Sequence, residues 1–94
     1  MTNRITIKTL HQNADMLNRM TGNLAEPYSK NDNGGYSANI GNYHISQAYG
    51  GYALHQMANA GGGIRDIFNR GHMPARELHG LIWAYVRGLE QAAA

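Results

Sequence analysis

Apolar side chains recur at helical spacing near the start of the chain. The intervals within residues 6–21 are three and four, the pattern of one face of an amphipathic helix, and the positions are Ile7, Leu10, Ala14 and Leu17. Thr6 suits the position before the first turn, because its hydroxyl can accept a hydrogen bond from an unpaired N–H. Gly22 suits the end, because it adopts a left-handed backbone without a Cβ penalty. The pattern therefore predicts a helix over residues 6–21.

A second helical stripe follows Pro74, which suits a first turn because no N–H partner is needed there. Its apolar positions are Leu78, Leu81, Ile82, Tyr85 and Leu89. Trp83 lies off this stripe, about 140° from Leu78 around the helix axis and near His79. A tryptophan on the polar side of a helix indicates a protein interface at Trp83 and His79. The alternative is a helix that packs on two sides within the monomer.

Between the two helices, residues 42–58 alternate between polar and apolar side chains, as half-buried strands do. If Gln47 pairs with Tyr52, one face collects Tyr43, Ile45, Tyr52 and Leu54. The other face collects His44, Ser46 and His55, with His44 opposite His55. A shift of one residue would mix the faces, so the pattern predicts an antiparallel hairpin. The alternative is a helix that starts near Tyr52, because good helix formers follow it.

The segments that flank this hairpin carry weaker signals. Residues 23–41 are loop-like, with an Asn-Asp-Asn-Gly-Gly turn signal between Tyr28 and Tyr36 that allows a short, ragged hairpin. Residues 59–63 are Gly-rich, and residues 64–68 suit either one turn of helix or an irregular edge strand. Together the signals predict a small single α+β domain over residues 1–94: an N-terminal helix, irregular antiparallel β-hairpins and a C-terminal helix, with both helices on one face of the sheet.

Composition sharpens this picture. Leu, Ile, Val and Phe total only 16 residues, whereas the chain has 12 Gly and 10 Asn. The formal net charge is +2, too small to predict a disordered tail or, by itself, a nucleic-acid partner. Nine of the 12 glycines lie within residues 34–71, so the unusual backbone belongs to the middle of the chain. At this size folding buries roughly 64% of the unfolded surface, a thin core that favours a homo-oligomer.

Several classes of site and location are disfavoured by composition. The chain contains no Cys, which removes disulfides, thiolate metal sites and cysteine nucleophiles and fits a reducing cytoplasm. The first residues show no apolar run of signal-peptide length, and no stretch approaches the ~18 apolar residues of a membrane span. We therefore expect no membrane partner. Paired carboxylates and nucleophile motifs are missing, so an enzyme is the less favoured class.

The two facing histidines are the first candidate for chemistry. His44 and His55 could line a ligand pocket, bind a metal or perform acid–base work. A metal would need further ligands, and none stands at a recognisable spacing, so no metal site is predicted. The alternative for the pair is a plain polar sheet face. Tyr49, in the turn between the strands, has no core position to fill and is the better stacking candidate among the tyrosines.

A second candidate follows the three glycines at residues 61–63. Backbone amides combined with Arg65, Arg70 and His72 are the groups with which proteins bind phosphate or carboxylate. Neither a P-loop nor a dinucleotide fingerprint is present. The alternative is a flexible connector with solvated arginines.

Three short motifs carry a resemblance to a known family. They are Ala-Asn-Ile-Gly-Asn-Tyr-His-Ile at residues 38–45, Ala-Tyr-Gly-Gly at residues 48–51 and Gly-Gly-Gly at residues 61–63. From Met16 onward the chain resembles a family of small proteins of tailed bacteriophages and prophages. The resemblance brings no activity and no functional residues. It implies a phage accessory protein in the host bacterial cytoplasm, where proteins of this size often counter host defence by blocking a protein or by sequestering a nucleotide signal.

The leading hypothesis is a non-enzymatic phage protein that counters host defence by binding a small anionic, nucleotide-like ligand. Its ligand-binding residues would be His44, Tyr49, His55, Arg65 and Arg70, with Tyr49 stacking, the arginines on phosphates and the histidines lining the pocket. One alternative is an inhibitor of a host defence protein that acts through Trp83 and His79. Another is a small enzyme that uses the histidine pair. We expect no cofactor, and DNA binding ranks last, because the basic residues do not cluster on one helix face.

Overall fold

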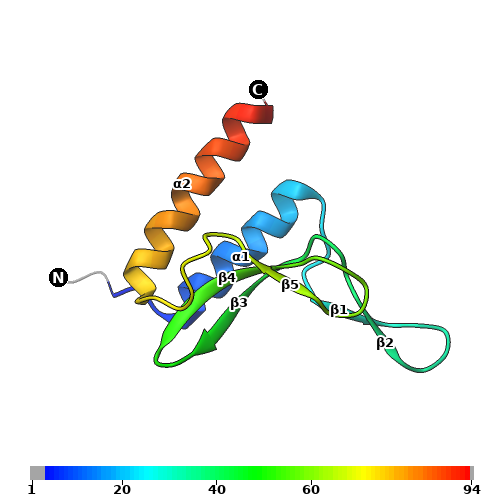
Figure 1. Ribbon diagram of the computed structural model, residues 1–94. Coiled ribbons are helices and arrows are strands. Elements are labelled where there is room, and N and C mark those ends of the chain that lie inside the picture. The colour runs from blue at the N-terminus through cyan, green and yellow to red at the C-terminus, as the bar shows by residue number, and fades with distance from the viewer. Residues whose placement is uncertain (1–3, 94) are drawn as a thin grey trace.

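In the computed structural model, which describes residues 4–93, two helices and two antiparallel sheets form an α+β fold (Figure 1). The elements are α1 (Ile7–Thr21), β1 (Tyr28–Lys30), β2 (Tyr36–Ala38), β3 (Tyr43–Ala48), β4 (Gly51–Met57), β5 (Ile64–Asp66) and α2 (Ala75–Ala93). The predicted fold class is confirmed. No helix in residues 4–93 is long and apolar enough to cross a membrane.

The limits of α1 follow from its capping residues. The Thr6 hydroxyl accepts a hydrogen bond from the Thr9 N–H at 3.3 Å, which satisfies one unpaired donor of the first turn. Gly22 ends the helix in the left-handed conformation, with φ of 74°. Both predicted caps are confirmed. The helix α2 begins at Ala75, so Pro74 lies just before the first helical residue, and its carbonyl accepts from the Leu78 N–H at 3.1 Å.

The sheet β3–β4–β5 has the predicted register at its centre. Gln47 pairs with Tyr52, and His44 pairs with His55. The alternative helix from Tyr52 is wrong, because residues 51–57 form the middle strand of the sheet. The ambiguous segment after the glycines is an edge strand, β5, which pairs antiparallel with β4.

The hydrophobic core lies between this sheet and the two helices, which cover the same sheet face (Figure 1). Its buried members are Leu10, Ala14, Leu17, Tyr43, Leu54, Met73, Leu78, Ile82 and Val86. The hydroxyls of Tyr43 and Tyr85 share a hydrogen bond of 2.8 Å. Burial, together with this bond, raises the pKa of the Tyr43 hydroxyl, which therefore stays neutral.

Buried asparagines connect the helices and loops to the sheet. Asn18 is 1% exposed, and its side chain donates to the Tyr43 carbonyl at 2.9 Å and accepts from the Tyr43 N–H at 2.7 Å. Asn42 is fully buried and donates to the Leu24 carbonyl at 2.7 Å. Within residues 4–93 every buried side-chain nitrogen and oxygen has a hydrogen-bond partner. The asparagine surplus therefore has a structural use, because these amides satisfy backbone groups that neither sheet nor helix pairs.

The second hairpin, β1–β2, projects away from the core (Figure 1). Its register pairs Tyr28 with Ala38, so the short hairpin allowed by the sequence is present. In its turn Asn31 accepts from the N–H groups of Asn33 and Gly35 at 3.1 and 3.0 Å. The residues of β1 are all exposed, so side-chain hydrogen bonds rather than burial shape this arm.

Candidate functional site

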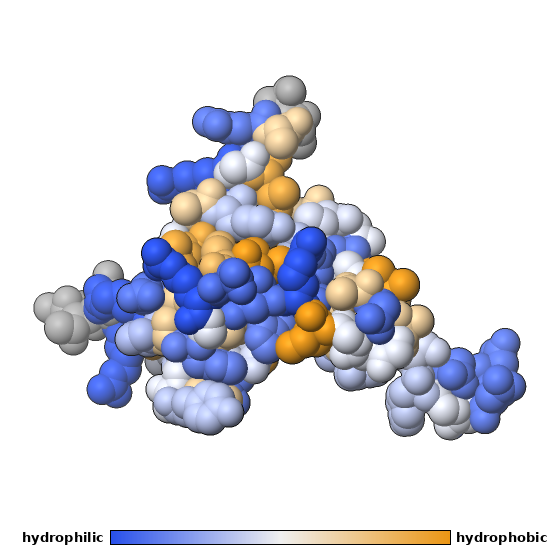
Figure 2. All heavy atoms as spheres, in the orientation of Figure 1, coloured by the Kyte–Doolittle hydropathy of each residue, from blue (hydrophilic) through white to orange (hydrophobic). Residues whose placement is uncertain are grey.

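Three imidazoles lie together on the sheet face that is opposite the helices. The ring centroids of His44 and His55 are 5.9 Å apart, and those of His55 and His72 are 6.0 Å apart, both pairs edge to face. Ser46, in the same row of β3, lies 2.9 Å from His72 between Oγ and Nε2. We call the surface formed by His44, Ser46, His55 and His72 the histidine face. The surface over this sheet is mostly hydrophilic in Figure 2.

The position of His44 defines its protonation pattern. Its Nδ1 lies 3.1 Å from Oδ1 of the buried Asn42, and this oxygen can only accept. In the neutral ring, Nδ1 therefore carries the proton and Nε2 is left with a free lone pair. Burial lowers the pKa of His44 from its ordinary value of 6.5, and the neighbouring His55 lowers it further. At neutral pH, His44 is thus an uncharged hydrogen-bond acceptor.

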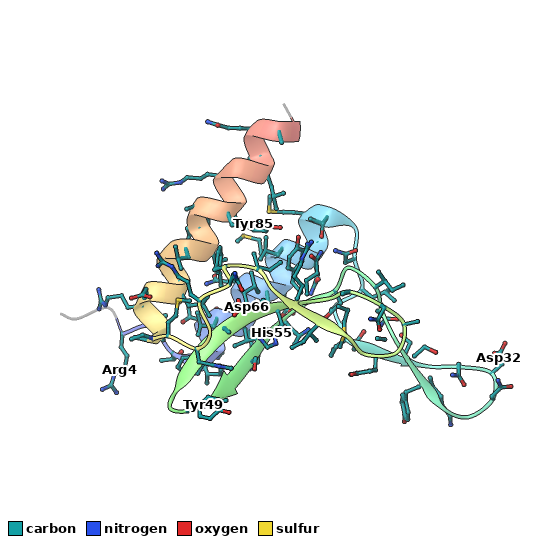
Figure 3. All side chains as sticks on the ribbon, viewed as in Figure 1. Arg4, Asp32, Tyr49, His55, Asp66 and Tyr85 are labelled. Atoms are coloured by element: carbon teal, nitrogen blue, oxygen red, sulfur yellow. The ribbon has the colours of Figure 1, made fainter. Side chains whose placement is uncertain are left out.

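His55 has a carboxylate neighbour as well as its histidine neighbours. Asp66 of β5 is its cross-strand partner, and the two labelled side chains lie close together in Figure 3. Burial lowers the pKa of His55, the charge of Asp66 raises it, and His72 lowers it, with a net decrease. His55 is therefore neutral at neutral pH, although it faces a carboxylate.

His72 reaches this face through contacts that are distant in sequence. Asp66 accepts from the Phe68 N–H at 3.3 Å and from the Gly71 N–H at 3.0 Å, which closes the turn before His72. Backbone bonds of 2.8 Å in both directions then join Met73 to Tyr52. A Cβ on Gly51 would lie only 3.0 Å from the Met73 nitrogen, so this close approach favours glycine.

Tyr49 occupies the tip of the turn between β3 and β4 (Figure 3) and is 98% exposed. Its φ of 55° and the φ of 74° at Gly50 are both left-handed, as a tight type I′ hairpin turn requires. A non-glycine residue in this conformation costs about 1 to 2 kcal/mol. The ring contacts His72 edge to face, with centroids 5.8 Å apart, so Tyr49 extends the histidine face at one end.

The structure separates Arg65 from the histidines. Arg65 pairs with Gln56 in the sheet and donates to its side-chain oxygen. Because paired residues share a face and neighbours in a strand alternate, Arg65 lies on the side opposite His55. There it borders a hollow of about 240 Å³, which is lined by Ile40, Gly41, Gln56, Met57, Ala58 and Arg65. The structure therefore does not bring Arg65 together with His44, Tyr49 and His55.

The remaining predicted site residues lie apart from one another. Arg70 is exposed in the turn two residues before His72. On α2, Trp83 is 38% exposed, and its ring lies edge to face with His79 at a centroid distance of 6.2 Å. His79 Nδ1 in turn lies 2.7 Å from the amide nitrogen of Asn13 on α1. Trp83 and His79 thus share one surface of the helix layer, away from the histidine face.

Sequence reasoning paired His44 with His55 but left His72 and Asp66 out of the predicted ligand-binding residues. No group of three or more His, Asp or Glu side chains among the described residues is arranged to hold a metal ion. Comparisons with protein-family models, curated proteins and solved structures find no match for the chain.

Proposed function

We propose that the histidine face binds a small anionic ligand with a planar ring, a nucleotide-like molecule, and that the chain is a non-enzymatic binding protein. One observation carries this proposal: three imidazoles and an exposed tyrosine are successive neighbours, with the centroids of adjacent rings 5.8 to 6.0 Å apart. Aromatic rings that stand free on a sheet are suited to stacking a base.

Tyr49 is the stacking group in this proposal. It does not fill the core, since 98% of its surface is exposed, and its backbone conformation is unfavourable for a side chain with a Cβ. Residues held in such conformations cluster at functional sites. A ligand ring packed on Tyr49 would cover apolar surface that the monomer leaves in water.

The histidines would recognise the polar edge of the ring. Because His44 presents a free Nε2 lone pair, it can accept a hydrogen bond from an amino or imino N–H of the ligand. The lowered pKa values of His44 and His55 keep both rings uncharged at neutral pH. They therefore contribute hydrogen bonds rather than charge.

The negative charge of the ligand requires a cation near the histidine face. Arg70 is exposed and precedes His72 by two residues, so we assign the phosphate contact to Arg70. Arg65 is not assigned this role, because it lies on the other side of the sheet. The ligand-binding set of the proposal is therefore His44, Tyr49, His55, Arg70 and His72.

The resemblance to phage proteins suggests the setting. In that setting the chain acts in the host bacterial cytoplasm as an accessory protein that sequesters a nucleotide signal of host defence. Sequestration needs binding without turnover, so the proposal predicts that the ligand is recovered unchanged after binding.

Isothermal titration against cyclic nucleotides and ADP-ribose derivatives tests this proposal. Loss of a stacked aromatic ring costs about 1 to 3 kcal/mol, so we expect Tyr49→Ala to weaken binding about tenfold or more. Tyr36→Ala is the matched control, because Tyr36 is 72% exposed on β2, and it should leave affinity unchanged, as should Arg65→Ala. Absence of heat with every compound of the panel would refute the proposal.

A second candidate is a protein inhibitor that acts through α2. The observation in its favour is an exposed Trp83 whose neighbour His79 is held by Asn13 at 2.7 Å, because ordered exposed tryptophans are frequent energetic centres of interfaces. Trp83→Ala should then abolish capture of a host protein from bacterial lysate. If the wild type captures the same proteins as Trp83→Ala, this candidate is wrong.

A further inference from the structure

The outer edge of β3 has a hydrogen-bonding pattern that the backbone contacts define. β3 is the edge strand of the order β3–β4–β5. The Met57 N–H donates toward β3, to Asn42, at 2.9 Å, whereas the Tyr52 N–H donates away from β3, to Met73, at 2.8 Å. Odd-numbered residues of β4 therefore face β3. In an antiparallel pair, a residue whose backbone N–H and C=O point toward the other strand lies opposite a residue that points back. The odd-numbered residues of β4 pair with residues 44, 46 and 48 of β3, so the backbone groups of these three point toward β4.

The backbone groups of Tyr43, Ile45 and Gln47 consequently point out of the sheet. Those of Tyr43 are both satisfied by the side chain of Asn18, at 2.9 and 2.7 Å. Among the described residues, no hydrogen bond reaches the outward N–H and C=O groups of Ile45 and Gln47. The edge is thus closed at one end and open over two residues.

This edge lacks the features with which proteins prevent strand pairing. Such edges usually carry charged residues, proline or a bulge, and β3 reads Tyr-His-Ile-Ser-Gln-Ala without any of them. Its pairing with β4 is continuous over all six residues. An open, regular and uncharged edge is a template for another strand.

We propose that the strand that pairs with this edge is β3 of a second copy of the chain. In the antiparallel arrangement centred on Ser46, Ile45 of each copy lies opposite Gln47 of the other. This register pairs every open N–H and C=O of both edges with an open group of the other copy. Moving the centre to Ile45 would instead place Gln47 against Tyr43, whose groups Asn18 already occupies.

The pairing joins two sheets of three strands into one continuous sheet. The two histidine faces then lie side by side, because Ser46 of each copy meets Ser46 of the other at the symmetry axis. His44 lies opposite Ala48 of the second copy, so the turn that carries Tyr49 in that copy follows next to it. The dimer therefore places an exposed tyrosine from one copy beside a histidine of the other.

A single engineered cysteine tests this geometry, because the chain has no Cys of its own. In the proposed register Ser46 forms a non-hydrogen-bonded pair with its counterpart, with Cβ atoms about 4.5 to 5.5 Å apart, close to disulfide distance. Ser46→Cys should form a disulfide dimer in a glutathione redox buffer. The control Ser29→Cys, on the exposed strand β1, should stay largely monomeric. A Ser46→Cys protein that remains monomeric like the control would overturn the proposal.

Sedimentation equilibrium of the cysteine-free chain gives an independent test. Gln47→Pro removes an outward N–H but leaves the bonds between β3 and β4, whereas the control Gln47→Thr keeps that N–H. We expect a wild-type dimer that Gln47→Pro weakens about tenfold or more and Gln47→Thr preserves. Circular dichroism checks that each variant is folded; if Gln47→Pro is not, the Ser46→Cys result decides. A monomeric wild type, or equal dimerisation of both folded variants, would contradict the inference.

Discussion

Tyr43 and His44 are neighbours in β3, yet their side chains serve different purposes. Tyr43 lies on the face that the helices cover, together with Leu54, and both are at most 4% exposed. His44 lies on the histidine face, where the large side chains are polar or aromatic and only partly buried. Burial of each large apolar side chain contributes about 1.5 to 3 kcal/mol. The helix-covered face therefore carries the stability, and the histidine face can carry chemistry at little structural cost.

The largest loss of stability should come from a substitution in the helix-covered face. Leu54 is fully buried in the core cluster, and Leu54→Ala should lower the free energy of unfolding by about 2 to 5 kcal/mol, because transfer and cavity costs add. Urea unfolding followed by circular dichroism measures this. The matched substitution on the other face, His44→Ala, should cost clearly less, and equal losses at both positions would erase the distinction between the faces.

The next loss of stability, of similar size, should follow removal of a buried polar contact. Asn18→Ala would leave the N–H and C=O of Tyr43 without their partners. Since each unsatisfied buried group costs about 1 to 3 kcal/mol, the expected loss in unfolding free energy is about 2 to 6 kcal/mol. Asn23→Ala is the control, because its amide bonds lie at the exposed or partly buried surface. If the two variants unfold at the same urea concentration, the Asn18 amide is not essential to the joint between α1 and β3.

The pH dependence of stability distinguishes the faces with a smaller effect. The pKa values of His44 and His55 are lowered from 6.5 in the folded chain, so the unfolded chain binds protons first as pH falls. The contribution of the two neutral imidazoles to the free energy of unfolding is fully present above pH 6.5. It is lost as pH falls through the pKa values of the folded chain. Urea midpoints should therefore decrease on acidification below that point. In a His44→Gln/His55→Gln variant this part of the decrease should disappear; an unchanged profile would contradict the burial of these rings.

The smallest expected change is a gain in stability rather than a loss. Tyr49→Asn replaces a left-handed tyrosine by a residue that tolerates this conformation and creates an Asn-Gly turn. We expect a gain of about 0.5 to 1 kcal/mol in unfolding free energy, together with loss of ligand binding. A stability loss in thermal unfolding would show that Tyr49 is retained for structure rather than for binding.

Local periodicity predicted the elements and the central register, because burial of one face fixes which residues must alternate. Asn18 follows Ala14 by four residues and so lies on the apolar stripe of α1, a signal that could have identified it as a buried connector. The face of Arg65 could not be predicted while residues 64–68 suited either a helical turn or a strand. The sequence marked His72 as a candidate beside Arg65 and Arg70, but its position next to His55 could not be predicted. The bridge between Tyr52 and Met73 that brings it there joins residues with no shared pattern.

The central claim is that the histidine face, rather than the Arg65 hollow or the Trp83 surface, is the binding site. Nuclear magnetic resonance titration of ¹⁵N-labelled protein with the nucleotide panel tests it most directly. We expect one compound to shift the imidazole signals of His44, His55 and His72 and the amide of Tyr49, while the Arg65 and Trp83 side-chain signals stay in place. Shifts confined to Arg65 or Trp83, or no shifts with any compound, would contradict the claim.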